Sequence, residues 1–316
     1  MDFHALFTQF GNDTTTGLAQ GAIYALFALG YTLVYGVLRL INFAHSEVFM
    51  LGTFAAVGVW AWFGYTENTS PPAFGMLLLL LIIGGIGAML ASGATAVVIE
   101  LIAYRPLRRR NAPPLAFLIT AIGASYAISE LMGTWTVRRP VGIPALLPRE
   151  PLFTLAGWRV TPLQIATVGT ALVMMFALDW FVQNTRFGRG IRAVAQDANT
   201  ASLMGVNKSR VILLVFLLGG LMAGVAAVFN DMQVGNTTYT AGFLLGLKAF
   251  SAAVLGGIGN LRGALVGGML LGLVENYAAA IFGTQWRDLV GFVVLVALLM
   301  FRPTGLLGES LGRARA

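Results

Sequence analysis

Residues 41–52 read Ile41-Asn42-Phe43-Ala44-His45-Ser46-Glu47-Val48-Phe49-Met50-Leu51-Gly52. They lie between two apolar runs, Gly17–Leu38 and Val48–Phe63. An amide, an imidazole and a carboxylate in this place would sit in or near a lipid bilayer. Polar and ionisable groups there are costly unless they face protein or water, and they commonly mark a transport pathway. The stretch therefore favours a transporter over an enzyme.

The composition indicates that nearly all of the chain lies in a membrane. Of its 316 residues, 57% are hydrophobic and only 10% are charged, whereas soluble domains carry about 25% charged residues. We expect an all-α polytopic protein with about 8–10 transmembrane helices, since backbone polar groups in lipid must be satisfied within each segment. Residues 1–316 would form a single transmembrane domain. The predicted spans are 17–38, 45–64, 73–102, 114–134, 162–182, 211–230, 243–258, 263–282 and 288–301.

Two polar interruptions predict broken or re-entrant helices, near 42–47 and near 256–262. Interruptions in corresponding places of two halves are typical of transporter binding sites. The long span 73–102 could tilt or break at Gly84–Gly87. Two helix starts have capping signals, Asn111 before the fourth span and Thr161 with Gln164 before the fifth. Glycines at four-residue spacing favour close helix packing within the chain; these pairs are Gly17/Gly21, Gly220/Gly224, Gly263/Gly267 and Gly268/Gly272.

The formal net charge of +7 comes from basic residues gathered in short loops, which indicates membrane orientation rather than nucleic-acid binding. We place three basic regions in the cytoplasm, with the N-terminus outside. They contain Arg105, Arg108, Arg109, Arg110, Arg186, Arg189, Arg192, Lys208, Arg210, Arg302, Arg313 and Arg315. The segment 135–160 would then be an external lid, although it carries Arg149 among other arginines. The chain has no cysteine and two histidines, which excludes thiolate chemistry and histidine metal clusters. No cofactor is expected.

The polar stretch 42–50 is the candidate solute pathway. On a helix, Asn42, His45 and Phe49 would share one face. A helix starting near Asn42 would present free N–H groups to an anionic group such as a carboxylate. Alternatively, Asn42 caps the helix, and His45 and Glu47 satisfy neighbours at a tight cytoplasmic corner. The candidate pathway residues are Asn42, Phe43, His45, Ser46, Glu47 and Phe49.

The cytoplasmic loop at about 184–210 is the candidate docking surface for a soluble partner. Alanine and leucine favour a short helix there, and Gly205 is suited to end it. Alternatively, this segment is a solvated basic loop that only fixes the membrane topology. The candidate contact residues are Arg192, Ala193, Gln196, Asp197, Ala201 and Gly205. Elsewhere, Lys248 and Glu275 lie deepest in the predicted spans among the ionisable residues, and they could form an ion pair. Such a pair more often has a structural role than a role in proton coupling.

Four stretches together resemble the LivH-type permeases, the membrane subunits of branched-chain amino acid ABC importers. The most specific is Gly30-Tyr31-Thr32-Leu33-Val34-Tyr35-Gly36-Val37-Leu38-Arg39-Leu40-Ile41-Asn42-Phe43-Ala44-His45, followed by Phe49-Met50-Leu51-Gly52. The others begin at Arg186, at Lys248 and at Arg302. The chain differs from the family pattern as we know it at Ser46-Glu47 and at Gln196.

This resemblance implies a division of labour. The chain and a second homologous permease, or a second copy, would form the path across the bacterial inner membrane. Two ABC ATPase subunits would bind on the cytoplasmic side, and a periplasmic binding protein would bind on the external side. The chain itself has no nucleotide-binding glycine motif, so it would be no enzyme. Two alternatives stay open: another small cargo such as urea, an amide or a different amino acid, and an ion-coupled secondary transporter using Lys248 and Glu275.

Overall fold

The computed structural model describes residues 3–147, 150–155, 158–302 and 304–308. Arg149, Arg313 and Arg315, which entered the orientation argument, lie outside the described residues. The chain folds as two compact units. Unit 1 comprises Met1–Thr32, Glu150–Asp179 and Lys248–Ala316, and unit 2 comprises Leu33–Arg149 and Trp180–Leu247.

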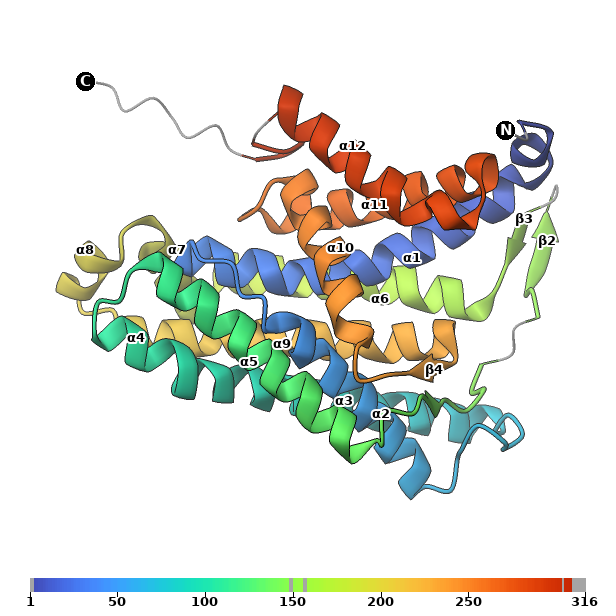
Figure 1. The fold of residues 1–316 in the computed structure, drawn as a ribbon, viewed down its shortest axis with the longest axis horizontal. Helices are drawn as coiled ribbons and strands as arrows, with labels where there is room; N and C mark the ends of the chain where they lie inside the picture. Colours follow the sequence, from blue (N-terminus) through green and yellow to red (C-terminus); the bar gives the residue numbers. More distant parts are fainter. Residues whose placement is uncertain (1–2, 148–149, 156–157, 303, 309–316) are drawn as a thin grey trace. The chain divides into compact units, whose positions relative to one another are not determined.

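The fold is almost entirely helical (Figure 1). The α-helices are α1 (Phe3–Leu38), α2 (His45–Trp62), α3 (Phe74–Ile99), α4 (Arg105–Arg109), α5 (Pro114–Trp135), α6 (Pro162–Asn184), α7 (Arg186–Gln196), α8 (Ala198–Leu203), α9 (Lys208–Val234), α10 (Ala241–Gly256), α11 (Leu261–Phe282) and α12 (Arg287–Phe301). A π-helical turn spans Glu100–Tyr104 and a 3-10 turn spans Thr284–Trp286. The strands are β1 (Val141–Gly142), β2 (Phe153–Leu155), β3 (Trp158–Val160) and β4 (Asn236–Thr237); β1 pairs with β4 and β2 with β3, both antiparallel.

Each predicted span coincides with a helix in the described part of the chain, so the all-α polytopic prediction is confirmed. Seven helices there are long and apolar enough to cross a membrane. The other two are not among these seven: α2 has 18 residues, as many as the shortest of the seven, but begins with three polar ones, and α10 has only 16. Helix α2 is buried along most of its length, as expected for a helix that other helices cover.

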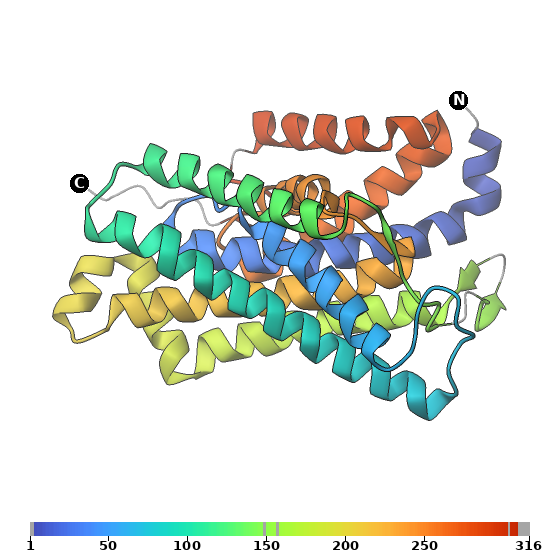
Figure 2. The ribbon, with the colours of Figure 1, turned by 60° about the horizontal axis from the view of Figure 1, so that its bottom comes forward.

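Unit 2 is built on the packing of α2, α3 and α9 (Figure 2). The Ser92 hydroxyl donates to the Val48 carbonyl at 2.9 Å, and the Trp60 indole donates to the Leu80 carbonyl at 3.0 Å. Position 48 thus faces position 92, and position 60 faces position 80, so α2 and α3 run antiparallel. The start of α2 therefore lies beside the end of α3.

The four glycine pairs all pack within the chain, as predicted. Gly220 and Gly224 of α9 pack directly against the backbone of α3 near Ser92 and Ala88. In unit 1, Gly17 and Gly21 meet Gly268 and Gly272 across the α1–α11 contact, and Gly263 and Gly267 lie against the end of α10. A Cβ atom at these positions would approach backbone rather than a flexible side-chain end.

Two local features differ from what the sequence suggested. Of the two alternatives for the long span 73–102, a tilt or a break, the break is contradicted: helix α3 continues through Gly84–Gly87, where the Trp60 indole fills the space beside Gly84. The departure from α-helical hydrogen bonding comes later, in the π-turn at Glu100–Tyr104. Asn111 does not cap α5, which begins at Pro114 without a side-chain cap. The other signal is confirmed: the Thr161 amide donates to Gln164 Oε1 at 3.0 Å, and the Gln164 amide donates to Thr161 Oγ1 at 3.3 Å.

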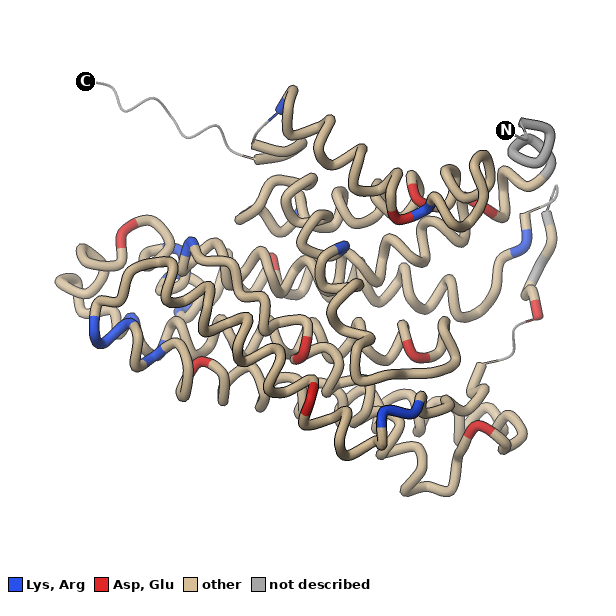
Figure 3. Tube along the Cα trace, in the orientation of Figure 1, with Lys and Arg blue, Asp and Glu red and all other residues tan. Residues whose placement is uncertain are grey.

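Most of the described arginines and lysines of unit 2 gather at the end that carries α4, α7 and α8 (Figure 3); Arg138 and Arg139, which follow α5, lie apart from them. The side chain of Arg39, directly after α1, also reaches this end and donates to the Ala195 carbonyl at 3.4 Å. Two of the basic regions that we predicted to be cytoplasmic therefore share one end of unit 2. The start of α2 lies close to it, because the end of α3 leads directly into α4.

Candidate functional site

The polar residues at the start of α2 form a buried cluster. Asn42, His45, Ser46 and Glu47 are each exposed by no more than 3%, and Phe49 is fully buried. Phe43 is partly exposed. The structure therefore brings the candidate pathway residues together, but it encloses them in protein.

Asn42 is held by a residue far along the chain. The Tyr104 hydroxyl donates to Asn42 Oδ1 at 3.0 Å. Tyr104 ends the π-turn, and its ring packs against Phe117 and Phe216, with centroids 5.7 and 5.3 Å away. Asn42 does not cap α2, whose N-cap is Ala44 without a side-chain hydrogen bond. The π-turn thus aims a fixed tyrosine at the polar segment.

The first turn of α2 has no row of free amide groups, so the expected anion site at a free helix start was wrong. The amides of His45, Ser46 and Glu47 donate to the carbonyls of Asn42, Phe43 and Ala44 at 3.1–3.3 Å. These short-range bonds use the donors that a carboxylate would need. In addition, the backbone of Gly242 at the start of α10 packs against the Ser46 carbonyl, leaving no space for a Cβ atom.

The Glu47 carboxyl is only partly satisfied. Its Oε1 accepts from the Ser125 hydroxyl of α5 at 2.9 Å and from the Ser46 hydroxyl at 3.2 Å. Its Oε2 is buried and has no hydrogen-bond partner among the described residues. A buried polar atom without a partner costs about 1–3 kcal/mol. Asn42 Nδ2 is likewise buried without a partner among the described residues, so Glu47 and Asn42 are both incompletely satisfied.

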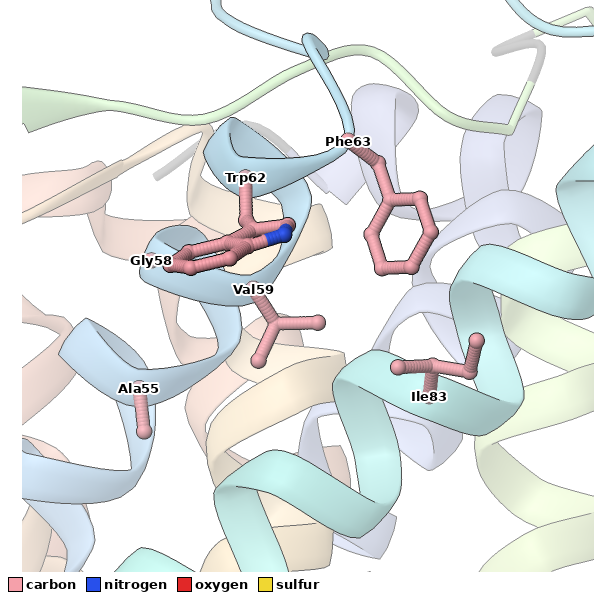
Figure 4. Close-up of a pocket in the computed structure, with 6 residues that line it drawn as sticks. All are labelled: Ala55, Gly58, Val59, Trp62, Phe63 and Ile83. Atoms are coloured by element: carbon pink, nitrogen blue, oxygen red, sulfur yellow. The ribbon is translucent and has the colours of Figure 1, made fainter.

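A pocket of about 380 Å³ opens near the other end of α2 and is lined by Ala55, Gly58, Val59, Trp62, Phe63 and Ile83 (Figure 4). Among the lining residues, only Trp62 has a polar side-chain atom, the indole nitrogen. A site for a zwitterion requires charged or strongly polar partners, because burying an unpaired charge is costly. We therefore do not assign this pocket to an amino acid.

The loop predicted to dock a partner folds as α7 and α8, joined at Asp197. Asp197 caps α8: its carboxylate accepts from the Asn199 amide at 2.8 Å and from the Thr200 hydroxyl at 2.6 Å. The hydrogen bonds from the Thr200 hydroxyl, the Thr200 amide and the Asn199 amide lower the pKa of this carboxyl, so the cap stays charged at neutral pH. Gly205 follows with a φ of 86°, as expected for a helix stop.

Three large apolar side chains of this loop are exposed among its polar residues, which the sequence reasoning missed. Phe187, Leu203 and Met204 are 67%, 87% and 81% exposed. Among the predicted contact residues, Gln196 and Asp197 are exposed, Ala193 is partly exposed and Ala201 is buried. The Arg192 side chain bonds the carbonyls of Val182 and Gln183 instead of projecting outward. Two apolar residues directly before a predicted helix stop were the signal that could have identified this exposed apolar group.

In unit 1, the predicted pair of Lys248 and Glu275 is confirmed, with Nζ 3.1 Å from Oε2. It belongs to a larger buried group that the sequence did not reveal. Lys248 also pairs with Asp288 at 2.6 Å, Arg287 lies 3.4 Å from Glu275, and the Tyr24 hydroxyl donates to Glu275 at 2.7 Å. We call Tyr24, Lys248, Glu275, Arg287 and Asp288 the Lys248 cluster. Its two positive and two negative charges balance.

Comparison with known protein families decides the identity. The family model described as "Branched-chain amino acid transport system / permease component" matches residues 14–299. The chain belongs to this family. As a member of the branched-chain amino acid permease family, it is a multi-pass membrane protein, and the LivH-type resemblance of its sequence is confirmed.

Relatives in this permease family match along almost the whole chain. The high-affinity branched-chain amino acid transport permease BraD of Pseudomonas aeruginosa is 40% identical over 93% of this chain and 94% of its own length. The permease LivH of Escherichia coli K12 is 37% identical over 96% of this chain and 97% of its own length. A probable LivH permease of Methanocaldococcus jannaschii is 26% identical over 92% of both chains.

Among solved structures, a chain of an ABC transporter assigned to the metal-chelate type, in an inward-facing conformation, resembles this permease with a TM-score of 0.51. The match covers 94% of this chain and 88% of that chain, at 15% sequence identity. At that identity the similarity concerns the fold alone. The two chains therefore share a fold.

Proposed function

We propose that this chain is the permease subunit of an ATP-driven importer that carries leucine, isoleucine and valine across the bacterial inner membrane by alternating access. The family match over residues 14–299 carries this proposal. Two relatives named as high-affinity branched-chain amino acid permeases, 37–40% identical over more than nine tenths of the chain, support the same cargo. ATP would be hydrolysed by partner subunits, because the chain has no phosphate-binding glycine motif.

The partners follow from the same assignment. A second permease, homologous or identical, would complete the path. Two ABC ATPases would bind the cytoplasmic face, and a periplasmic binding protein would deliver the amino acid. We propose that α7 and α8 form the contact with the ATPase, since three large apolar side chains on them and at the turn after α8 are exposed: Phe187, Leu203 and Met204. Exposed apolar patches of this kind commonly mark a protein interface.

The function is tested by uptake of labelled leucine into proteoliposomes that hold this chain with its companion permease and ATPases. ATP is supplied on the ATPase side and binding protein on the other. We expect ATP-dependent uptake that valine and isoleucine compete and urea does not. Uptake of urea in place of leucine would reject the cargo. Leucine uptake driven by an ion gradient without ATPases would reject the mechanism.

We propose further that Asn42, Phe43, His45, Ser46, Glu47 and Phe49 belong to the inner part of the solute path, closed in this conformation. The support is the concentration of buried polar groups beside the basic end of unit 2, including the half-satisfied Glu47 carboxyl. Polar groups inside a membrane protein are costly and usually serve a path.

A single cysteine can test this path, because the native chain contains none. We expect Ser46→Cys to be unreactive towards an aqueous thiol reagent at rest and to become reactive when ATP drives the transport cycle. Ala56→Cys, on the same helix and equally buried, is the matched control and should stay unreactive throughout. Protection of Ser46→Cys in every transport state would exclude this residue from the path.

A further inference from the structure

The Lys248 cluster surrounds a narrow space in unit 1 that leaves no room for a water molecule. Its lining combines charged groups with an apolar wall and one hydroxyl. The lining residues are Lys248, Ser251, Leu271, Glu275, Asp288, Gly291 and Phe292. They come from α10, α11 and α12, so three separate helices converge on this space. A few convergent polar groups in an apolar surround are typical of small-molecule sites.

The positive charges of the cluster crowd around one oxygen. Glu275 Oε2 accepts from the Tyr24 hydroxyl at 2.7 Å and from Lys248 Nζ at 3.1 Å. The Nε atom of Arg287 lies 3.4 Å from the same oxygen. Glu275 is 1% exposed and the Lys248 side chain 9%. A bilayer protein tolerates such charges because they neutralise one another.

The Arg287 guanidinium nevertheless has unused donors. Its Nε and Nη2 atoms are buried and have no hydrogen-bond partner among the described residues. The ion pair with Glu275 supplies attraction but no hydrogen bond that meets ordinary geometry. A guanidinium presents a planar fork of N–H groups that matches a carboxylate with two parallel bonds. The Nε atom already lies 3.4 Å from the Glu275 carboxylate without a hydrogen bond, so these donors are left available for a second carboxylate.

We propose that the Lys248 cluster binds the charged groups of an amino acid, with Arg287 and Lys248 taking the α-carboxylate and Glu275 and Asp288 taking the α-ammonium. This inference rests on the proposed function and deepens it. The cluster is neutral, so it accepts a ligand that is itself neutral overall without burying a net charge. Leu271 and Phe292 offer an apolar wall to a branched aliphatic side chain.

The exposure of the cluster suggests how the ligand enters. Asp288 is 47% exposed and Arg287 30%, whereas Glu275 is buried. Both exposed residues begin α12, directly after the 3-10 turn that links it to α11. In the predicted orientation this end of α12 faces outward, where a binding protein would release its cargo. The narrow space would open when the start of α12 moves and the ion pairs exchange with the ligand.

Equilibrium binding of labelled leucine to the purified complex, without nucleotide or binding protein, tests the proposal. We expect valine and isoleucine to compete. We expect no competition at the same concentration from 4-methylpentanoate, which lacks the ammonium, or from isopentylamine, which lacks the carboxylate. Competition by 4-methylpentanoate or isopentylamine as strong as that of valine would overturn the proposal. This binding experiment needs no variant of the protein.

Variants then locate the site. Arg287→Lys keeps the positive charge but loses the planar fork, and we expect it to weaken leucine binding at least tenfold without lowering thermal stability. Asp288→Asn should weaken binding in the same way. Arg262→Gln is the control, since Arg262 forms an exposed ion pair with Asp179 in the same unit and should bind leucine normally. Unchanged leucine affinity in Arg287→Lys and Asp288→Asn would refute the site. Normal leucine uptake by the wild-type complex would leave the proposed function standing in that case. Absent leucine uptake in the wild-type complex would reject the function itself.

Discussion

Replacing Gly272 with leucine is expected to prevent the chain from folding. Gly272 lies where α11 crosses α1, and a Cβ atom there would run into the amide nitrogen of Gly21 and the carbonyl oxygen of Gly17. Both obstacles are backbone, so neither can turn aside as a side chain would. Overpacking a core usually costs about 1–3 kcal/mol, and we expect more here because two helices must separate.

The expected loss is large because the α1–α11 contact depends on close approach. Membrane helices associate by van der Waals packing between small residues rather than by the hydrophobic effect. On α1, Gly21 is also confined by backbone, since its own Cβ would lie 2.7 Å from the Gly268 carbonyl oxygen. A leucine at position 272 would remove this contact along both helices. Proteins are stable by only about 5–15 kcal/mol, so little folded protein should remain.

The measurement is the yield of monodisperse protein after detergent extraction, together with its thermal unfolding. Gly169→Leu is the matched control: it adds the same side chain to α6, and a Cβ atom at position 169 meets no other atom within 4 Å. We expect it to behave like the wild type. Equal yields and melting temperatures for Gly272→Leu and Gly169→Leu would contradict the packing argument.

Replacing Met204 with aspartate is expected to abolish ATP-driven uptake without affecting the fold. Met204 and its neighbour Leu203 are more than four fifths exposed, so neither contributes much to the stability of this chain. If they dock into the ATPase, an aspartate would bury an unpaired charge in the interface. Losing the burial of a methionine side chain costs about 1.5–3 kcal/mol, and burying an unpaired charge costs more than that. We expect uptake to fall to the level without ATP, and the ATPase to lose its stimulation by cargo-loaded binding protein.

Met204→Leu separates docking from a general sensitivity of this loop. It retains an apolar side chain of similar size, and we expect it to keep uptake within about twofold of the wild type, since volume-conserving apolar changes usually cost less than about 1.5 kcal/mol. Copurification of the ATPase with each variant gives an independent readout. Normal ATPase binding and uptake with Met204→Asp would remove these helices from the proposed contact.

The candidate sites were only partly readable from the sequence. Lys248 and Glu275 could be paired in advance because both are charged and lie deep in apolar spans. Arg287 and Asp288 could not be added, since nothing in the sequence near α12 indicates which side of α11 it packs against. Similarly, Tyr104 is separated by 62 residues from Asn42, and Ser125 by 78 residues from Glu47. Pairing them requires the antiparallel arrangement of α2 and α3 and the position of α5.

The sequence by itself determined what depends on local composition and spacing. Runs of apolar residues located every span, the glycine spacings predicted close packing, and the Thr161–Gln164 pattern predicted a helix start. These features follow from transfer free energy, helix periodicity and neighbouring hydrogen bonds, all of which act within a few residues. Only the tertiary structure decided which polar groups meet, that the first amides of α2 are occupied, and that Arg287 has donors without a hydrogen bond. Those outcomes depend on the depth and facing of helices distant in sequence, which local patterns do not encode.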